Sequence, residues 1–217
     1  MPSPLASELA SKPVVPLIEA DEPETAVEIA RALKAAGMPL VEVVQRTPRS
    51  LECLEAIAAE LPGLVTGAGT VLSGTQTRAC IAKGARFIVS PGLDDGVVEA
   101  AHSAGIDVFP GIMTPTELQH ASNLGLRVVK FFPASAAGGV PALRALASVF
   151  RAMRFMPTGG ISASNLAEYL SLPAVLACGG SWMTPKDAVA ARDYGRITAL
   201  AAAALAIAAA ARGADAA

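Results

Sequence analysis

Two charged residues stand inside apolar segments where strands are expected, and both could carry chemistry. Glu42 lies in the run Leu40–Val44, and Lys130 lies in the run Arg127–Phe131. A carboxylate buried in a strand is costly unless it is paired or used. Burial also favours the neutral form of a lysine, which is the form that attacks a carbonyl carbon. We therefore expect Lys130 to be a Schiff-base nucleophile and Glu42 to be its acid/base partner.

Each of these residues also has a purely structural explanation. Glu42 could form an ion pair with Arg46 inside the fold. Lys130 could point outward and place its ammonium group between helices. The occurrence of both residues in one chain favours the catalytic interpretation.

Two glycine pairs follow the last two expected strands. Gly159-Gly160 comes after the run Arg154–Met156, and Gly179-Gly180, with Ser181, comes after the run Ala174–Ala177. Because glycine has no Cβ, its backbone N–H group can approach a phosphate closely, and a following helix N-terminus adds a favourable field. The predicted phosphate ligands are therefore Gly159, Gly160, Gly180 and Ser181.

The segment Gly67–Leu72 follows the third expected strand. It begins like a dinucleotide-binding fingerprint but has Leu72 where the third glycine belongs, so we reject that interpretation. We expect a close backbone approach to a small ligand here, with the Thr70 hydroxyl as a donor. Pro91, after the fourth strand, is expected to shape the mouth of the same site.

The sequence does not predict a metal site or a disulfide framework. His102 and His120 lie in helical patterns without a nearby carboxylate cluster. The three cysteines, Cys53, Cys80 and Cys178, are odd in number and share no CxxC spacing. We expect no metal, no cofactor and a reducing, cytoplasmic compartment.

The composition limits the class of protein. Of the 217 residues 53% are apolar and 17% are charged, which excludes a disordered chain and indicates a large core. The net charge of −2 offers no basic excess for a nucleic-acid partner. The N-terminal Met1–Lys12 does not resemble a signal peptide. The uncharged run Ile197–Ala211 is shorter than the roughly 20 residues of a membrane span, so we expect a packed terminal helix and no membrane segment.

Short β-branched runs alternate with helical patterns along the whole chain. The runs are Val14–Ile18, Leu40–Val44, Leu64–Gly67, Phe87–Ser90, Asp107–Pro110, Arg127–Phe131, Arg154–Met156 and Ala174–Ala177. Such runs, separated by helices, are typical of buried parallel strands. They predict one domain over residues 1–217, a (β/α)₈ TIM barrel with an extra N-terminal helix at Leu5–Ala10. An open doubly wound sheet is the alternative.

Local signals place the helix ends. Capping boxes are predicted at Asp21-x-x-Glu24, Ser73-x-x-Gln76 and Thr114-Pro115-x-Glu117. Closing glycines in the left-handed conformation are predicted at Gly37, Gly84, Gly105 and Gly125.

With these motifs in place, the chain resembles the 2-keto-3-deoxy-6-phosphogluconate (KDPG) aldolases over about residues 13–200. The matching segments are Val41-Glu42-Val43 with Arg46-Thr47, Gly67–Leu72, Ser90-Pro91-Gly92, Lys130–Ala134, Pro157–Ile161 and Gly179–Trp182. The resemblance implies a metal-independent class I aldolase on a (β/α)₈ barrel, usually a homotrimer. It implies cleavage of the phosphorylated keto-acid to pyruvate and glyceraldehyde 3-phosphate, and often of 4-hydroxy-2-oxoglutarate.

The resemblance also implies roles for single residues. The Schiff-base lysine falls on Lys130 and the acid/base glutamate on Glu42. Arg46, helped by Thr70, would bind the substrate carboxylate, and Phe132 would pack against the substrate chain. The phosphate loops fall on Gly159, Gly160, Gly180 and Ser181.

Specificity is less well defined by the resemblance. Thr158 is expected to favour the gluconate epimer, since relatives acting on the galactonate epimer tend to have an apolar residue there. Glu19, where other members often carry an apolar or basic residue, is the other candidate. An aldolase for the galactonate epimer, a phosphosugar isomerase using Glu42 as base and a non-catalytic phosphate-ligand sensor stay open as alternatives.

Overall fold

The β-branched runs form parallel strands in the computed structural model, which describes residues 4–213. The strands are β1 Val14–Ile18, β2 Leu40–Val44, β3 Val65–Gly69, β4 Phe87–Val89, β5 Asp107–Phe109, β6 Gly111–Ile112, β7 Val128–Phe131, β8 Arg154–Pro157 and β9 Cys178–Gly180. One sheet has the order β5-β4-β3-β2-β1-β9, and the other has the order β6-β7-β8. The fold is therefore α/β, with a curled, six-stranded parallel sheet at its centre.

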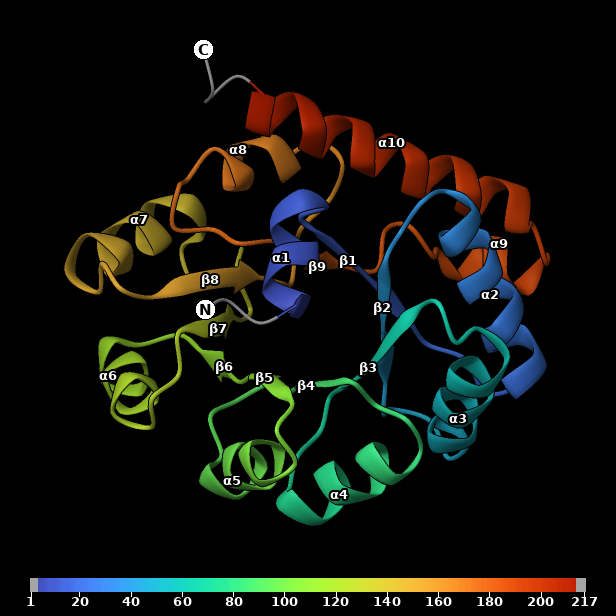
Figure 1. Cartoon of the computed structure of the whole chain (residues 1–217). Coiled ribbons are helices and arrows are strands. Elements are labelled where there is room, and N and C mark those ends of the chain that lie inside the picture. Colours follow the sequence, from blue (N-terminus) through green and yellow to red (C-terminus); the bar gives the residue numbers. More distant parts are fainter. Residues whose placement is uncertain (1–3, 214–217) are drawn as a thin grey trace.

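The helices other than α1 lie outside the strands, which surround a common centre (Figure 1). The helices of the fold are α1 Pro4–Ser11, α2 Pro23–Ala35, α3 Ser50–Glu60, α4 Gly74–Ala82, α5 Asp95–Ser103, α6 Pro115–Asn123, α7 Gly139–Val149, α8 Leu166–Leu170, α9 Lys186–Ala190 and α10 Tyr194–Gly213. Each strand except β5, which is followed directly by β6, is followed by a helix on the outside. The alternation expected from the sequence is therefore confirmed, and the carboxyl ends of the strands meet on one face.

The break between the two sheets has a local cause at Pro110. This residue separates β5 from β6, and a proline has no N–H to continue the ladder. Its carbonyl still accepts a hydrogen bond of 2.9 Å from the N–H of Lys130. On the other side of the three-stranded sheet, two isolated bridges, Phe155↔Val175 and Thr158↔Gly179, connect β8 to the segment that contains β9.

Most predicted helix ends are confirmed. Thr114 and Glu117 form a complete capping box at α6. At α4 only half of the predicted box forms: Ser73 accepts from the N–H of Gln76, but the Gln76 side chain accepts from the N–H of Leu72. All four closing glycines have positive φ. The capping box at Asp21 is wrong, because α2 begins after Glu22 with Pro23 in its first turn and has no side-chain cap.

The last strand differs from the prediction. Residues Ala174 to Leu176 exchange hydrogen bonds with Phe155 of β8, but the regular strand is Cys178–Gly180, which pairs with β1. The chain therefore changes neighbours within a few residues. Both glycines of the pair that the sequence analysis places in a loop, Gly179 and Gly180, lie inside the strand.

Alternation along the strands divides the apolar residues into two cores. Val41, Val43 and Val129 belong to the outer core between strands and helices. The inner core, enclosed by the strands, is Leu5, Leu9, Val15, Leu40, Phe87, Val89, Phe109, Met156 and Ala177. Leu5 and Leu9 come from α1, which lies across the centre of the ring (Figure 1). Because Val15 and Leu40 lie early in their strands, α1 closes the end opposite the carboxyl ends of the strands.

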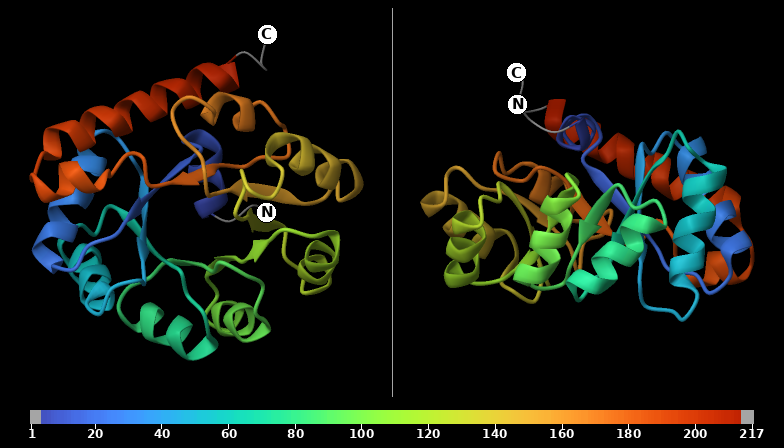
Figure 2. Two further views of the ribbon diagram at one scale, coloured as in Figure 1. Left: turned by 180° about the vertical axis from the view of Figure 1, so that it is seen from behind. Right: turned by 60° about the horizontal axis from the view of Figure 1, so that its bottom comes forward.

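The C-terminal run forms the expected packed helix. By length and composition, α10 is the one helix within residues 4–213 that could cross a membrane. Its buried residues are Ile197, Ala201, Ala204 and Ala208. The helix runs along the outside of the fold past α8 and α2 in both views of Figure 2. This packing accounts for the apolar stripe, and the remaining exposed positions are mostly small alanines.

Candidate active site

Lys130 is directed into the inner core by the alternation of β7. Its neighbours Val129 and Phe131 both face the outer core. Lys130 itself is 2% exposed, and its Nζ lies 4.8 Å from the centroid of the Phe132 ring. The alternative of an outward-pointing lysine is therefore wrong.

Glu42 enters the same inner space from β2, where Val41 and Val43 point outward. It is completely buried, and neither carboxylate oxygen has a hydrogen-bond partner among the described residues. An ion pair with Arg46, the structural alternative, is not formed, because the guanidinium of Arg46 contacts other residues. A buried carboxyl group without a partner is rare and points to a functional role.

The surroundings shift the pKa values of this pair in opposite directions. Burial raises the pKa of Glu42, and the charges of Lys130 and then Arg46 oppose this. Burial lowers the pKa of Lys130; Glu42 opposes the shift and Arg46 adds to it. Both shifts favour neutral side chains, so the site combines an amine prepared for nucleophilic attack with a carboxyl group able to donate a proton.

Glycines of β3 create the space for these groups. A Cβ at Gly69 would lie 2.0 Å from Oε1 of Glu42, and a Cβ at Gly67 would lie 2.2 Å from the Phe87 ring. Gly69 thus makes room for a side chain of the site, Glu42, and Gly67 makes room for a side chain of the inner core, Phe87. The sequence analysis expected them to make room for a ligand.

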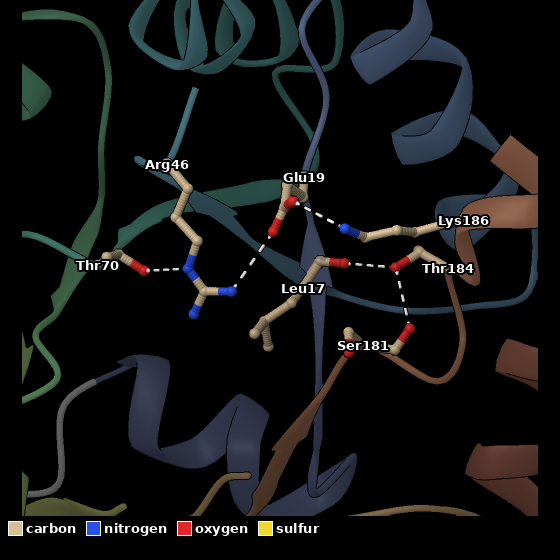
Figure 3. Close-up of polar contacts among 7 residues, drawn as sticks. All are labelled: Leu17, Glu19, Arg46, Thr70, Ser181, Thr184 and Lys186. Atoms are coloured by element: carbon tan, nitrogen blue, oxygen red, sulfur yellow. Dashed lines mark hydrogen bonds and ion pairs between the residues drawn. The ribbon is translucent and has the colours of Figure 1, made fainter. Parts of the chain in front are cut away.

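Arg46 lies at the carboxyl end of β2, between two partners (Figure 3). Its Nε donates to Oγ1 of Thr70 at 3.0 Å, and its Nη1 donates to Oε2 of Glu19 at 3.4 Å. Thr70 has a φ of +59°, which is uncommon for a residue other than glycine. This strained backbone places the hydroxyl beside the guanidinium. The contact with Glu19 was not foreseen, although the sequence showed a carboxylate directly after the first strand.

The loops after β8 and β9 are neighbours because Thr158 bridges to Gly179. Within residues 4–213, no hydrogen bond is found that uses the backbone N–H of Gly160 or Ser181. Gly159 and Gly160 have φ values of +93° and +78°. Free N–H groups on two adjoining loops form a suitable cradle for an anion.

The neighbouring loop fixes this cradle. Ser135 donates from Oγ to the carbonyl of Gly160 at 3.1 Å, and the Asn165 amide donates to the same carbonyl at 2.8 Å. A Cβ at Gly160 would lie 2.2 Å from Oγ of Ser135. The Ser135 contact connects the cradle to the segment that follows Lys130.

Gly180 has a different structural reason to be glycine. It is buried in β9, and a Cβ there would lie 2.0 Å from the Trp182 ring. Of the residues predicted for the second loop, Ser181 is therefore better placed than Gly180 to meet a ligand.

The other predicted residues surround Lys130. Phe132 lies beside its amine and also within 3.3 Å of the position that a Cβ on Gly159 would take. Thr158 is 4% exposed and lies two positions after Met156, an inner-core residue that pairs with Lys130. A Cβ at Gly111, the partner of Lys130 on its other side, would lie 2.0 Å from the carbonyl oxygen of Pro91. The structure thus brings the predicted site residues together towards the carboxyl ends of the strands, with Gly180 buried in the last position of β9.

A cavity of about 480 Å³ opens beside these residues, with Arg46, Glu19, Ser181 and Lys186 in its wall. Another cavity, of about 680 Å³, lies at the opposite end, under α1. Of these two cavities, only the first has predicted site residues, Arg46 and Ser181, in its wall, and neither cavity is lined by Lys130 or Glu42; chemistry and not volume therefore identifies the site. In the part of the chain that the structure describes, no cluster of His, Cys, Asp and Glu is arranged to hold a metal ion.

Comparison with known proteins defines the class of this enzyme. The profile of the aldolase family described as "KDPG and KHG aldolase" matches residues 5–200. The KHG/KDPG aldolase of Escherichia coli (strain K12) is 47% identical over 89% of this chain and 91% of its own length.

Solved structures agree with the sequence comparison. The KDPG aldolase of Legionella pneumophila, with pyruvate captured as a covalent carbinolamine, has a TM-score of 0.89 and 39% identity over 93% of this chain and 98% of its own. The 2-keto-3-deoxy-6-phosphogluconate aldolase of Zymomonas mobilis ZM4, with 3-phosphoglycerate, has a TM-score of 0.88 and 40% identity over 94% and 96%.

The protein is therefore a lyase, an aldolase of the Schiff-base type. The chain belongs to the KDPG and KHG aldolase family.

Proposed function

We propose that this enzyme cleaves 2-keto-3-deoxy-6-phosphogluconate to pyruvate and D-glyceraldehyde 3-phosphate, and that it also accepts 4-hydroxy-2-oxoglutarate. The observation that carries the proposal is the buried Lys130, with its lowered pKa, beside the unpartnered carboxyl group of Glu42. An amine of this kind attacks a ketone at neutral pH.

In the first half of the mechanism, the neutral amine of Lys130 adds to C2 of the keto-acid. Glu42, whose raised pKa favours the protonated form, donates a proton to the carbinolamine hydroxyl, which leaves as water. The product is a protonated imine, an electron sink next to the bond that must break. No metal is required, because the imine itself polarises the substrate.

In the second half, the carboxylate of Glu42 accepts the proton of the C4 hydroxyl. The electrons of the C3–C4 bond move to the imine nitrogen, which gives an enamine and releases glyceraldehyde 3-phosphate. Protonation at C3 and attack by water on the imine then release pyruvate and restore the lysine. A single carboxyl group thus serves each proton transfer in turn.

Binding residues orient the substrate along this path. Arg46 and Thr70 bind the carboxylate, with Arg46 offering paired donors. Phe132, Thr158 and Pro91 border the reacting carbons. The N–H groups of Gly159, Gly160 and Ser181 hold the phosphate, and Gly180 supports that loop.

Reductive trapping tests the function. Pyruvate with sodium borohydride should inactivate the enzyme and add the mass of a reduced pyruvate adduct to Lys130, identified by peptide mass spectrometry. Borohydride alone, and pyruvate with the Lys130→Met variant, are the controls. Labelling of another lysine, or none, would refute the assignment. A phosphosugar isomerase and a phosphate-ligand sensor both predict no adduct.

The family resemblance also supports inferences about the barrel, the oligomeric state and the location of the enzyme. We infer that the two sheets close into a complete (β/α)₈ barrel, which the bridges between β8 and the β9 segment and the hydrogen bond across Pro110 support. We infer a single domain over residues 1–217, a homotrimer and a cytoplasmic location. Light scattering should give about three times the chain mass of 21.9 kDa, and a mass of one chain would refute the trimer.

A further inference from the structure

Glu19 is the feature at the mouth of the site that the proposed mechanism does not use. It directly follows β1, and its carboxylate lies between two cations (Figure 3). Oε2 accepts from Nη1 of Arg46 at 3.4 Å, and Oε1 lies 3.6 Å from Nζ of Lys186. The two oxygens thus have separate partners, Arg46 and Lys186.

These contacts do little for stability. The side chains of Arg46 and Glu19 are 45% and 39% exposed, and that of Lys186 is 94% exposed. Exposed ion pairs of this kind contribute almost nothing to the free energy of unfolding. A carboxylate beside an anion-binding arginine also weakens the positive potential there. Glu19 must therefore be explained by what it does to the geometry of Arg46.

The geometry of Arg46 is set from two edges. Thr70 accepts from Nε and Glu19 accepts from Nη1. In Figure 3 the remaining nitrogen, Nη2, points away from both partners and from the Arg46 backbone. A guanidinium is a rigid planar fork, so fixing two of its nitrogens fixes the direction of the third.

We propose that Glu19 is a positioning residue. Glu19 accepts a hydrogen bond from Nη1 of Arg46 while Thr70 accepts one from Nε, and the two contacts together direct the free edge of the guanidinium towards the carboxylate of the bound keto-acid. This inference rests on the proposed function, since it takes the ligand of Arg46 to be that carboxylate. Lys186 holds the second oxygen of Glu19 and limits its rotation.

The test is a series of substitutions at Glu19, with the KM for pyruvate and the KM for glyceraldehyde 3-phosphate measured separately. Glu19→Ala removes both contacts, and its KM for pyruvate in aldol synthesis should rise about tenfold, the effect expected from loss of one orienting charged contact. Glu19→Gln keeps an acceptor oxygen and should show a smaller rise. The kcat, and the KM for glyceraldehyde 3-phosphate, should stay within about twofold in both variants, because the contacts do not reach the phosphate end.

Two controls test whether the effect is specific to Glu19 and whether it acts through Arg46. Glu22→Ala removes a nearby exposed glutamate that pairs with Arg49, and it should leave both KM values unchanged. Arg46→Ala should itself raise the pyruvate KM, and adding Glu19→Ala to it should have no further effect, because the residue that Glu19 orients is gone.

Each other outcome overturns the inference. A lower KM for pyruvate in Glu19→Gln would mean that the carboxylate competes with the substrate for Arg46. Unchanged KM values, or additive effects with Arg46→Ala, would mean that Glu19 does not act through Arg46. Failure of the proposed function is distinguished by the wild-type enzyme, which would then form no borohydride adduct with pyruvate at all.

Discussion

Gly69 and Glu42 occupy adjacent strands so closely that a Cβ on the glycine would lie 2.0 Å from Oε1 of the glutamate. The register Val44↔Gly69 and Glu42↔Gly67 brings the end of β3 beside the carboxyl group. Since real Cβ atoms do not approach so closely, either the carboxyl group or the strand would have to move. The position of the proton-transferring group is therefore set by the residue that faces it as well as by its own strand.

Gly69→Ala should consequently displace Glu42 and reduce kcat by about 10² or more, the size of a lost acid/base contribution. Circular dichroism should show that the fold is kept. Gly63→Ala is the matched control, because a Cβ there meets only the flexible end of Lys34 at 3.4 Å. A Gly69→Ala enzyme with normal kcat would show that Glu42 tolerates displacement.

Glu42→Gln tests the proton transfer directly. The amide keeps the shape of the side chain but cannot accept and return a proton, so turnover should fall by about 10² or more. Exchange of the pyruvate methyl protons with deuterated water, followed by NMR, should slow in parallel. Full exchange in this variant would assign the proton transfer to another group.

The central pair could be predicted from the sequence because alternation along a strand decides which side chains share a face. Val129 and Phe131 on one face require Lys130 to lie on the other, and Val41 and Val43 do the same for Glu42. Positive-φ glycines and the Thr114 capping box were predictable for a similar reason, since each depends on a few adjacent residues.

Features that depend on distant partners could not be predicted in this way. The last strand lies at Cys178–Gly180 and not at Ala174–Ala177, because pairing with β1 and not apolar composition decides where it is regular. The two partners of Arg46 come from segments more than twenty positions away along the chain. Gly180 leaves room for the Trp182 ring, and a short glycine motif does not reveal this packing contact.

Lys130→Met should stabilise the fold while abolishing catalysis. The lowered pKa of Lys130 means that folding disfavours its charged form. In the range between the folded-state pKa and the unfolded value of about 10.4, the unfolded chain binds more protons, so wild-type stability rises with pH. The gain in the free energy of unfolding from Lys130→Met should therefore be largest at low pH and should shrink towards pH 10. At neutral pH it should be about 1 to 2 kcal/mol.

Denaturant unfolding at several pH values measures this difference. Lys34→Met, at an exposed position, is the control and should change stability little at any pH. A stability gain in Lys130→Met that does not depend on pH would mean that the lysine carries no charge penalty in the folded enzyme.

Thr158 is predicted to distinguish the epimers of the substrate at C4. It is 4% exposed, and its Oγ1 has only a long contact of 3.4 Å with the carbonyl of Met156, so the hydroxyl is available for a substrate oxygen. A buried group that hydrogen-bonds one epimer is left unpaired by the other. One such bond is worth roughly 1 to 1.5 kcal/mol, or about tenfold.

Thr158→Val, which keeps the shape of the side chain, should therefore lower the ratio of kcat/KM for the gluconate epimer to that for the galactonate epimer by about tenfold. Proton exchange of pyruvate should be nearly unchanged, because pyruvate lacks the C4 hydroxyl. Thr66→Val, at a buried position of β3 that faces the outer layer, is the control for loss of a hydroxyl alone. An unchanged ratio would place the discrimination elsewhere, and slower exchange would mean that Thr158 acts on the Schiff base and not on the epimer.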